Sequence, residues 1–230
     1  MNPTNSPAEK NSGPAQSAAA APAAVAQPAG LPRTMRKRIA VSAYIVLPVA
    51  VLAVLSAPKI AADGAAAMAL GSLGWVLFFL YSFIRFWSTL YIGSRKAREL
   101  QTDGPYSICR NPLYLGSFCF ALAVAVLLAS LSLLVAILVV GLIYRFSVIP
   151  REEAMLRSIF GSEFDRYAAR TPRLWPRLRL FAAGETLQVN MRGIQREARY
   201  QLFSLFLMLL LVALCHLRYQ PWWPHCFNLP

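Results

Sequence analysis

The sequence has few acidic side chains and little charge of any kind. Asp and Glu together number 10 against 23 Lys and Arg, and charged residues make up only 14% of the 230 positions. Hydrophobic residues make up 57%, and the mean hydropathy is +0.47. A soluble domain carries about 25% charged residues. The composition therefore excludes an ordinary soluble domain and predicts a membrane protein.

Cysteine and histidine are also scarce. The chain has two histidines, His216 and His225, both close to its C-terminus. The four cysteines have neither the paired spacing of a zinc site nor the density of a disulfide scaffold; they are Cys109, Cys119, Cys215 and Cys226. No Gly-rich phosphate loop is present. We expect no metal site and no disulfide framework.

The net charge of +13 does not indicate a nucleic-acid partner. The basic residues lie between long apolar runs and form no continuous stripe, which a nucleic-acid interface would need. Anionic lipid headgroups attract Lys and Arg that flank membrane helices, by about 1 kcal/mol per residue. Membrane lipids are therefore the expected partner of this charge.

The first 32 residues have a different composition from the rest. They are rich in Ala, Pro, Ser, Asn and Gln, which bury too little apolar surface to offset the entropy of ordering the chain. Pro22 and Pro28 interrupt the Ala-rich stretch, and the basic cluster follows it, so a secretory signal is not expected. We predict a disordered tail over residues 1–32.

Apolar runs predict an all-α fold, a polytopic transmembrane bundle of about five spans. A spanning helix needs roughly 20 apolar residues, which residues 39–57 and 65–93 supply. Residues 112–149 are about twice that length and predict a helical hairpin that turns near residues 129–132. Residues 199–217 supply the last span. The expected parts are a membrane domain over 33–198 and an additional span with a Trp-rich tail over 199–230.

Lys and Arg predict the orientation of the bundle, because cationic loops resist translocation. Basic residues cluster before the first span, between spans two and three, and over residues 151–199, where there are ten arginines. Lys59 and Arg218 are the basic residues expected on the other side. The prediction places the N-terminus in the cytoplasm and the C-terminus outside.

Two polar segments, 94–111 and 150–198, abut opposite ends of the predicted hairpin, so we expect them to meet on the cytosolic side. Pro112 suits the first turn of a helix and Asn111 its cap, which alone would make this a capped membrane helix. Arg110 at the membrane boundary, Tyr114 and the small Gly116 would also form a cleft that admits an anionic group.

Acidic and basic residues close to the membrane suggest further chemistry. Glu152 and Glu153 follow a span directly, where charges are costly unless they are used or paired. They point about 100° apart on a helix, so one could face a ligand while the other pairs with arginine; the alternative is stabilisation of a helix N-terminus. Arg85 lies about 12 Å inside the second span, and we expect it to face a polar partner in the bundle. Arg145 is close enough to the interface to snorkel.

The order of these residues resembles the isoprenylcysteine carboxyl methyltransferase and phospholipid methyltransferase superfamily in its short bacterial form. The resemblance covers roughly residues 70–178. Its motifs are Arg85-Phe86-Trp87, Gly104-Pro105-Tyr106, the segment Arg110-Asn111-Pro112-Leu113-Tyr114-Leu115-Gly116, Glu152-Glu153, Phe160-Gly161, Phe164, Tyr167 and Pro172.

The resemblance implies a pocket for S-adenosylmethionine at the cytosolic end of the bundle and a lipid-like substrate that enters from the bilayer. It implies that Arg110 and Arg173 act at the catalytic centre by holding an anionic substrate head. The cofactor contacts that it implies are Asn111, Pro112, Tyr114, Gly116, Glu152 and Glu153. Asn111 departs from the family, which usually has His there; Asn can still hydrogen-bond an adenine edge but cannot transfer a proton.

Three functions remain open from the sequence. The leading one is methylation of a lipid-like carboxylate or amine. The second is an NADPH-dependent reductase of the sterol reductase type, which carries a similar Arg-His-Pro-x-Tyr segment, and the third is a non-catalytic membrane scaffold or sensor. The expected location is a bacterial inner membrane, with the endoplasmic reticulum as the alternative. The sequence does not identify the methyl acceptor.

Overall fold

A computed structural model describes residues 33–58, 60, 64–92, 99–184, 189–224 and 226, with side chains from Tyr44 onward. Within these residues every regular element is a helix. The predicted all-α fold is therefore confirmed. The expected disordered tail, residues 1–32, lies outside the described residues.

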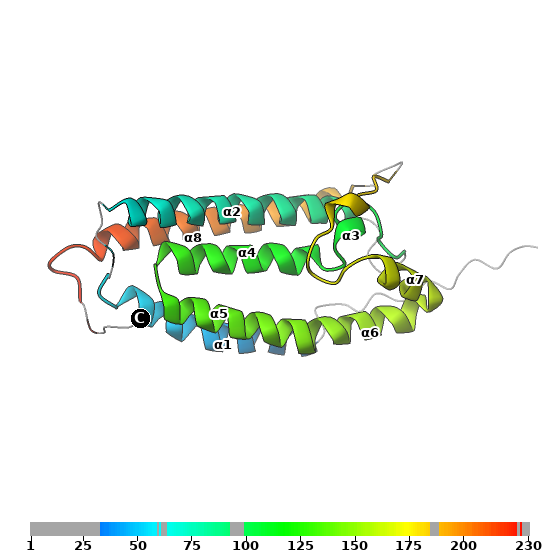
Figure 1. Cartoon of the computed structure of the whole chain (residues 1–230), viewed down its shortest axis with the longest axis horizontal. Helices are drawn as coiled ribbons and strands as arrows, with labels where there is room; N and C mark the ends of the chain where they lie inside the picture. The colour runs from blue at the N-terminus through cyan, green and yellow to red at the C-terminus, as the bar shows by residue number, and fades with distance from the viewer. Residues whose placement is uncertain are drawn as a thin grey trace, which may run out of the picture.

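Long helices lie side by side, and short ones gather at one end of the bundle (Figure 1). α2 packs most extensively against α4 and also contacts α8, whereas α1 packs along α5. The small elements α3 and α7 lie at the end where α4 begins. The helix bounds are α1 Arg33–Val54, α2 Ala65–Ile92, α3 Pro105–Ile108, α4 Pro112–Leu127, α5 Leu131–Ile143, α6 Ile149–Phe160, α7 Ser162–Arg170 and α8 Met191–Leu217.

Three helices are long and apolar enough to cross a membrane: α2, the continuous helix Leu131–Phe160, and α8. The described part of α1 and the whole of α4 are shorter apolar helices. α4 has 16 residues, or about 24 Å at the helical rise, which is less than the roughly 30 Å of a hydrocarbon core. α4 alone is therefore too short to cross the hydrocarbon core without local thinning.

The last span is longer than the sequence predicts. The expected helix over 199–217 begins instead at Met191, because Asn190 caps it by accepting hydrogen bonds from the backbone N–H groups of Arg192 and Gly193. An amide side chain at this position satisfies donors that the first turn leaves unpaired. The boundary expected at residue 199 thus falls inside α8.

The predicted hairpin turns within one residue of the expected place. Residues 128–130 link α4 to α5, and Ala129 adopts a φ of 49°. Ser130 caps α5, because its Oγ accepts a hydrogen bond from the Leu133 N–H. The two arms of the hairpin then bring residues 110–114 and 149–153 to the same end of the molecule.

The second arm of the hairpin does not stop at the membrane boundary. A π-helical turn, Tyr144–Val148, joins α5 to α6 without a break. Pro150 follows this turn and has no N–H to donate, and a local change of helical pitch relieves the clash of a proline ring with the preceding turn. The continuous helix carries Glu152 and Glu153 beyond the apolar segment on a rigid element.

The core lies between the helices, and large apolar side chains cover the outside. One buried cluster joins α1, α4, α5 and α8 and includes Ala53, Leu133 and Leu211; a second joins α2, α4 and α8 and includes Phe78 and Met208. Many bulky residues point outward, as on a surface that faces lipid; examples are Phe79, Phe83, Val135, Leu142, Phe203 and Phe206.

A sharp corner folds α7 back toward α3. Gly161 links α6 to α7 with a φ of 52°, a conformation that favours glycine. The corner lets Phe164 become almost completely buried, at 1% exposure. The Tyr167 hydroxyl then donates a hydrogen bond of 2.8 Å to the backbone oxygen of Tyr106. α7 and α3 are thereby fixed to one another at the end where α4 begins.

Candidate functional site

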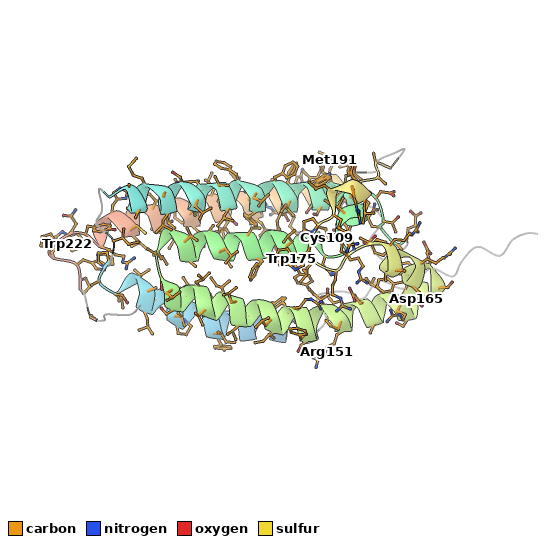
Figure 2. All side chains as sticks on the ribbon, in the orientation of Figure 1. Cys109, Arg151, Asp165, Trp175, Met191 and Trp222 are labelled. Carbon is orange, nitrogen blue, oxygen red and sulfur yellow. The ribbon has the colours of Figure 1, made fainter. Side chains whose placement is uncertain are left out.

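The two polar segments on either side of the hairpin meet as predicted. The Gly104 N–H donates to the Ala182 oxygen at 2.8 Å, the Arg110 N–H to the Pro172 oxygen at 2.9 Å, and the Arg177 N–H to the Ile108 oxygen at 3.0 Å. Residues 172–182 therefore lie against residues 104–110. Figure 2 shows Cys109 and Trp175, one from each segment, at the same end of the bundle as Met191, with Trp222 at the opposite end.

Glu153 lies between two arginines that come from the two segments. Its Oε2 is 2.7 Å from Arg173 Nη2, and its Oε1 accepts a hydrogen bond of 3.1 Å from Arg173 Nε. The same Oε1 is 3.4 Å from Arg110 Nη1. The Glu153 side chain is only 7% exposed. We define Arg110, Glu153 and Arg173 as the charge triad.

Arg110 is the less satisfied of the two cations. Its side chain is 13% exposed, and its Nε is buried without a hydrogen-bond partner among the described residues. Burial lowers the pKa of Arg110, the nearby Glu153 carboxylate opposes that effect, and Arg173 adds to it. A buried guanidinium donor without an acceptor is costly. Because this nitrogen is buried, a ligand acceptor could reach it only if neighbouring side chains moved.

The neighbouring carboxylate has a different partner. The Tyr114 hydroxyl on α4 donates a hydrogen bond of 2.6 Å to Glu152 Oε1 on α6. The Tyr144 ring lies edge-on to the Tyr114 ring, with centroids 5.5 Å apart. Glu152 is half-buried, whereas Glu153 is buried. The adjacent glutamates therefore have different partners: Glu152 accepts a hydrogen bond from a tyrosine, and Glu153 pairs with two arginines.

Asn111 is not the side-chain cap that the sequence predicts. Its side chain makes no capping hydrogen bond to α4. Instead its Nδ2 donates a hydrogen bond of 3.0 Å to the backbone oxygen of Arg173. The Asn111 amide thus joins the start of α4 to residues 172–174. Pro112 does begin the first turn of α4, as predicted.

Gly116 lies against α2 and not beside the charge triad. A Cβ atom added to Gly116 would be 2.9 Å from Arg85 Cγ and 3.4 Å from Ile84 Cγ2. Contacts under 3.0 Å do not occur for real Cβ atoms, so the glycine lets Arg85 pass close to α4. Arg85 in turn pairs with Glu197 of α8, with both hydrogen bonds at 2.8 Å. The polar partner expected for Arg85 is thus present.

Sequence reasoning missed Cys109 as part of this end of the molecule. Its thiol is 1% exposed and donates to the backbone oxygen of Leu174 at 3.2 Å. Burial raises the pKa of this thiol to about 11. A lone cysteine before a helix gives no sequence signal of this contact. Glu197 was also missed, although it is an isolated acidic residue in a strongly basic segment.

The described part of the chain contains no group of three or more His, Cys, Asp or Glu residues placed to hold a metal ion.

Comparison with known proteins places these residues in a family. A family model described as phospholipid methyltransferase matches residues 61–163. The nickel-cobalt-cadmium resistance protein NccN of Alcaligenes xylosoxydans xylosoxydans is 36% identical over 146 residues, which are 64% of this chain and 68% of that protein. The cobalt-zinc-cadmium resistance protein CzcN of Cupriavidus metallidurans is 37% identical over 113 residues.

The second match covers 49% of this chain and about half, 52%, of the relative. No solved structure matches the chain. The family match contains α2, α4, both glutamates and the start of α7. With its long apolar helices and this match, the chain is an integral membrane protein that belongs to the phospholipid methyltransferase family, within the isoprenylcysteine and phospholipid methyltransferase superfamily.

Proposed function

We propose that this protein is an S-adenosylmethionine-dependent methyltransferase that modifies a lipid-like acceptor, a carboxylate or an amine. One observation carries the proposal. The charge triad and the Tyr114–Glu152 hydrogen bond lie at one end of the bundle and are assembled from residues up to 63 positions apart, Arg110 and Arg173. Burying this much charge is costly. A site that binds a polar ligand beside apolar helices would explain why these charges are present.

The chemistry of these residues fits the cofactor. The Glu152 carboxylate can accept hydrogen bonds from ribose hydroxyls or from an ammonium group, and the partly exposed Arg173 guanidinium can donate to a carboxylate. Asn111 and Tyr114 add an amide and a phenol. Bound S-adenosylmethionine would supply an electrophilic methyl group on a sulfonium. Glu152 would place negative charge near this cation, whereas the charge of Glu153 is already matched by Arg110 and Arg173.

The side chains work mainly by positioning and by excluding water. A carboxylate acceptor needs no deprotonation before it attacks, so an enzyme gains most of its rate by orientation and desolvation. Arg173 is 31% exposed and can turn part of its hydrogen bonding from Glu153 to an anionic substrate head. Arg110 stays buried beside Glu153. An amine acceptor would first have to lose a proton, for which Glu152 is the nearest half-buried carboxylate to the proposed cofactor site.

The membrane supplies the substrate and sets the orientation in this proposal. The acceptor reaches the charge triad from the bilayer, because the surrounding helices expose apolar side chains. The basic end of the bundle faces the cytoplasm of a bacterial inner membrane, as cationic loops favour. α1 would then begin on the cytoplasmic side, and α8 would end on the opposite side, because these two helix ends lie at opposite ends of the bundle (Figure 1).

A link to metal resistance is proposed from the relatives alone. NccN and CzcN are named for resistance to nickel, cobalt, zinc and cadmium. The corresponding proposal is that the methylated product helps cells to tolerate these ions. A host that lacks the gene, complemented by wild type or by Glu152→Gln, tests it by growth on graded nickel or cobalt. Equal rescue by both would separate the resistance from methyl transfer.

Binding of S-adenosylmethionine and of NADPH to the purified full chain tests the main proposal. We expect calorimetry to show saturable binding of S-adenosylmethionine that Glu152→Gln weakens by about tenfold or more, since a charge-assisted hydrogen bond is worth 1.5–3 kcal/mol. Glu163→Gln, the same change on exposed α7, is the matched control.

The other outcomes decide between the remaining functions. Binding of NADPH without S-adenosylmethionine would favour the reductase. Folded protein that binds neither would favour a scaffold or sensor. Transfer of radiolabelled methyl groups to an isoprenylcysteine or to a lipid amine then identifies the class of acceptor.

A further inference from the structure

α8 lies outside the family match, yet it carries the most deeply buried carboxylate of the described helices. Glu197 is 4% exposed and lies in the basic first part of α8, between the exposed Arg196 and Arg199. It forms a two-pronged ion pair with Arg85 of α2, whose Nε and Nη2 each lie 2.8 Å from one Glu197 oxygen. Gln201 Nε2, one turn further along α8, donates to Glu197 Oε1 at 3.1 Å. A buried ion pair is costly to desolvate, and its bidentate geometry fixes the orientation of both side chains.

Arg85 also contacts α4, the helix that carries Tyr114. Its stem occupies the space that a side chain at position 116 would need. Its Nη1 is 3.4 Å from the hydroxyl of Ser117. Gly116 and Ser117 follow Tyr114 by less than one helical turn. Arg85 therefore contacts the first turns of α4 on the side roughly opposite to Tyr114, the residue that binds Glu152.

We propose that Glu197 is a positioning residue for the candidate site, and that α8 is part of the functional unit. In this proposal Glu197 fixes the Arg85 guanidinium, Arg85 fixes the depth of the first turns of α4, and α4 in turn sets Tyr114 and the charge triad. The chain of contacts is continuous from Glu197 to Glu152. The effect on the cofactor rests on the proposed function; the effect on α4 does not.

A second contact between α2 and α8 provides a matched control. The Tyr81 hydroxyl and Ser204 Oγ are 2.8 Å apart and both are buried. Ser204→Ala removes this hydrogen bond between the same two helices without touching Arg85. If α8 merely stabilised the bundle, each variant would accelerate the labelling of Cys109 only in proportion to its loss of unfolding free energy, which is measured alongside. If Arg85 transmits the position of α8 to α4, only the Glu197 variant alters the site.

Cys109 reports the position of the start of α4 without any ligand. Its buried thiol lies two residues before Asn111 and donates to Leu174. The full chain in lipid nanodiscs is treated with N-ethylmaleimide, and the modified fraction of each cysteine is followed by peptide mass spectrometry. Cys226 is exposed and serves as the internal standard. Glu197→Gln keeps the shape of the side chain and removes its charge.

In Glu197→Gln we expect N-ethylmaleimide to modify Cys109 about tenfold faster than in wild type, since local opening sets the reactivity of a buried group. In Ser204→Ala the rate of modification should equal that of wild type. Wild-type labelling in Glu197→Gln, or equal acceleration in Ser204→Ala, would overturn the proposal, whether or not the protein binds a cofactor.

A double-variant measurement tests the link to the cofactor. Glu197→Gln and Tyr114→Phe should each weaken the binding of S-adenosylmethionine. The double variant should weaken binding by less than the product of the two separate factors, because both residues act through one chain of contacts. Full multiplicativity would overturn the link. Absence of cofactor binding in wild type would refute the proposed function instead, and the labelling of Cys109 would still decide the role of Glu197.

Discussion

Arg173 and Glu153, which are 20 residues apart, are joined by a hydrogen bond of 3.1 Å from Arg173 Nε to Glu153 Oε1 and by an ion-pair contact of 2.7 Å between Arg173 Nη2 and Glu153 Oε2. Two-pronged pairing fixes the plane of the guanidinium as well as its distance. Glu153 lies on the rigid helix α6, whereas Arg173 lies in an irregular segment. The ion pair therefore holds that segment against the bundle, and it places the Arg173 backbone oxygen within reach of Asn111.

Replacing the buried carboxylate of the charge triad should destabilise the protein. Glu153→Gln leaves Arg110 and Arg173 close together without a counter-charge, and breaking a buried ion pair costs about 3–5 kcal/mol. The partial exposure of Arg173 reduces this cost. We expect a clear fall in the thermal midpoint in detergent, measured by tryptophan fluorescence. Glu152→Gln, on the half-buried neighbour, should cause a much smaller fall; equal falls would contradict the assignment.

Removing the Tyr114 hydroxyl should affect ligand binding more than stability. Tyr114→Phe keeps the ring packed against Tyr144 and deletes the hydrogen bond to Glu152. The loss of one such bond should cost only about 1 kcal/mol of stability. We expect binding of S-adenosylmethionine to weaken by about tenfold. Tyr200→Phe, an exposed position on α8, is the control, and unchanged binding in Tyr114→Phe would contradict the proposed role.

Restoring the residue that the family usually has at position 111 tests the one departure from its motif. In Asn111→His an imidazole N–H can still donate to the Arg173 oxygen, so we expect the protein to fold. Binding of S-adenosylmethionine should then become pH-dependent near the ordinary pKa of histidine, about 6.5. Asn111→Ala removes the donor and should weaken binding at every pH. A flat pH profile in Asn111→His would show that position 111 does not face the cofactor.

The sequence predicted the parts of this fold that depend on local pattern. Apolar runs gave the helices, and the length of the 112–149 run gave a hairpin whose turn lies at Ala129. The meeting of the two polar segments followed from that hairpin. Arg85 was expected to have a polar partner, because an unpaired charge cannot remain at that depth.

The remaining features depend on contacts between residues far apart in the chain. Asn111 has the residue type of a cap, but the carbonyl that it binds belongs to Arg173 and appears only after folding. Gly116 has the residue type of a ligand-binding position, but its missing side chain admits Arg85. No sequence pattern distinguishes these uses of asparagine and glycine. The identity of the partner of Arg85, 112 positions away, was unpredictable for the same reason.

The segment beside the charge triad should lie in the lipid headgroup layer. Trp175 is 83% and Leu178 75% exposed, and Arg177 and Arg179 lie between and beside them. Aromatic and basic side chains together favour the interface of an anionic membrane. In nanodiscs, lipids brominated near the headgroup should quench the fluorescence of wild type more than that of Trp175→Phe. Equal quenching would place Trp175 in water.

The buried thiol of Cys109 makes stability depend on pH in the alkaline range. Burial raises its pKa from 9.0 to about 11, so the folded state keeps the proton at a pH where the unfolded state loses it. Stability is therefore complete below pH 9 and falls as the pH rises from 9 toward 11, with a slope of at most about 1.4 kcal/mol per pH unit.

Cys109→Ser isolates this contribution, because a serine hydroxyl can also donate to the Leu174 oxygen but does not ionise in this range. Other groups that titrate above pH 9 act equally on both proteins and cancel in the comparison. We expect the difference in unfolding free energy between wild type and Cys109→Ser to be constant from pH 7 to 8.5 and then to shift against wild type. A constant difference through pH 10.5 would mean that the thiol ionises as easily in the folded protein as in water, and would contradict its burial against residues 173 and 174.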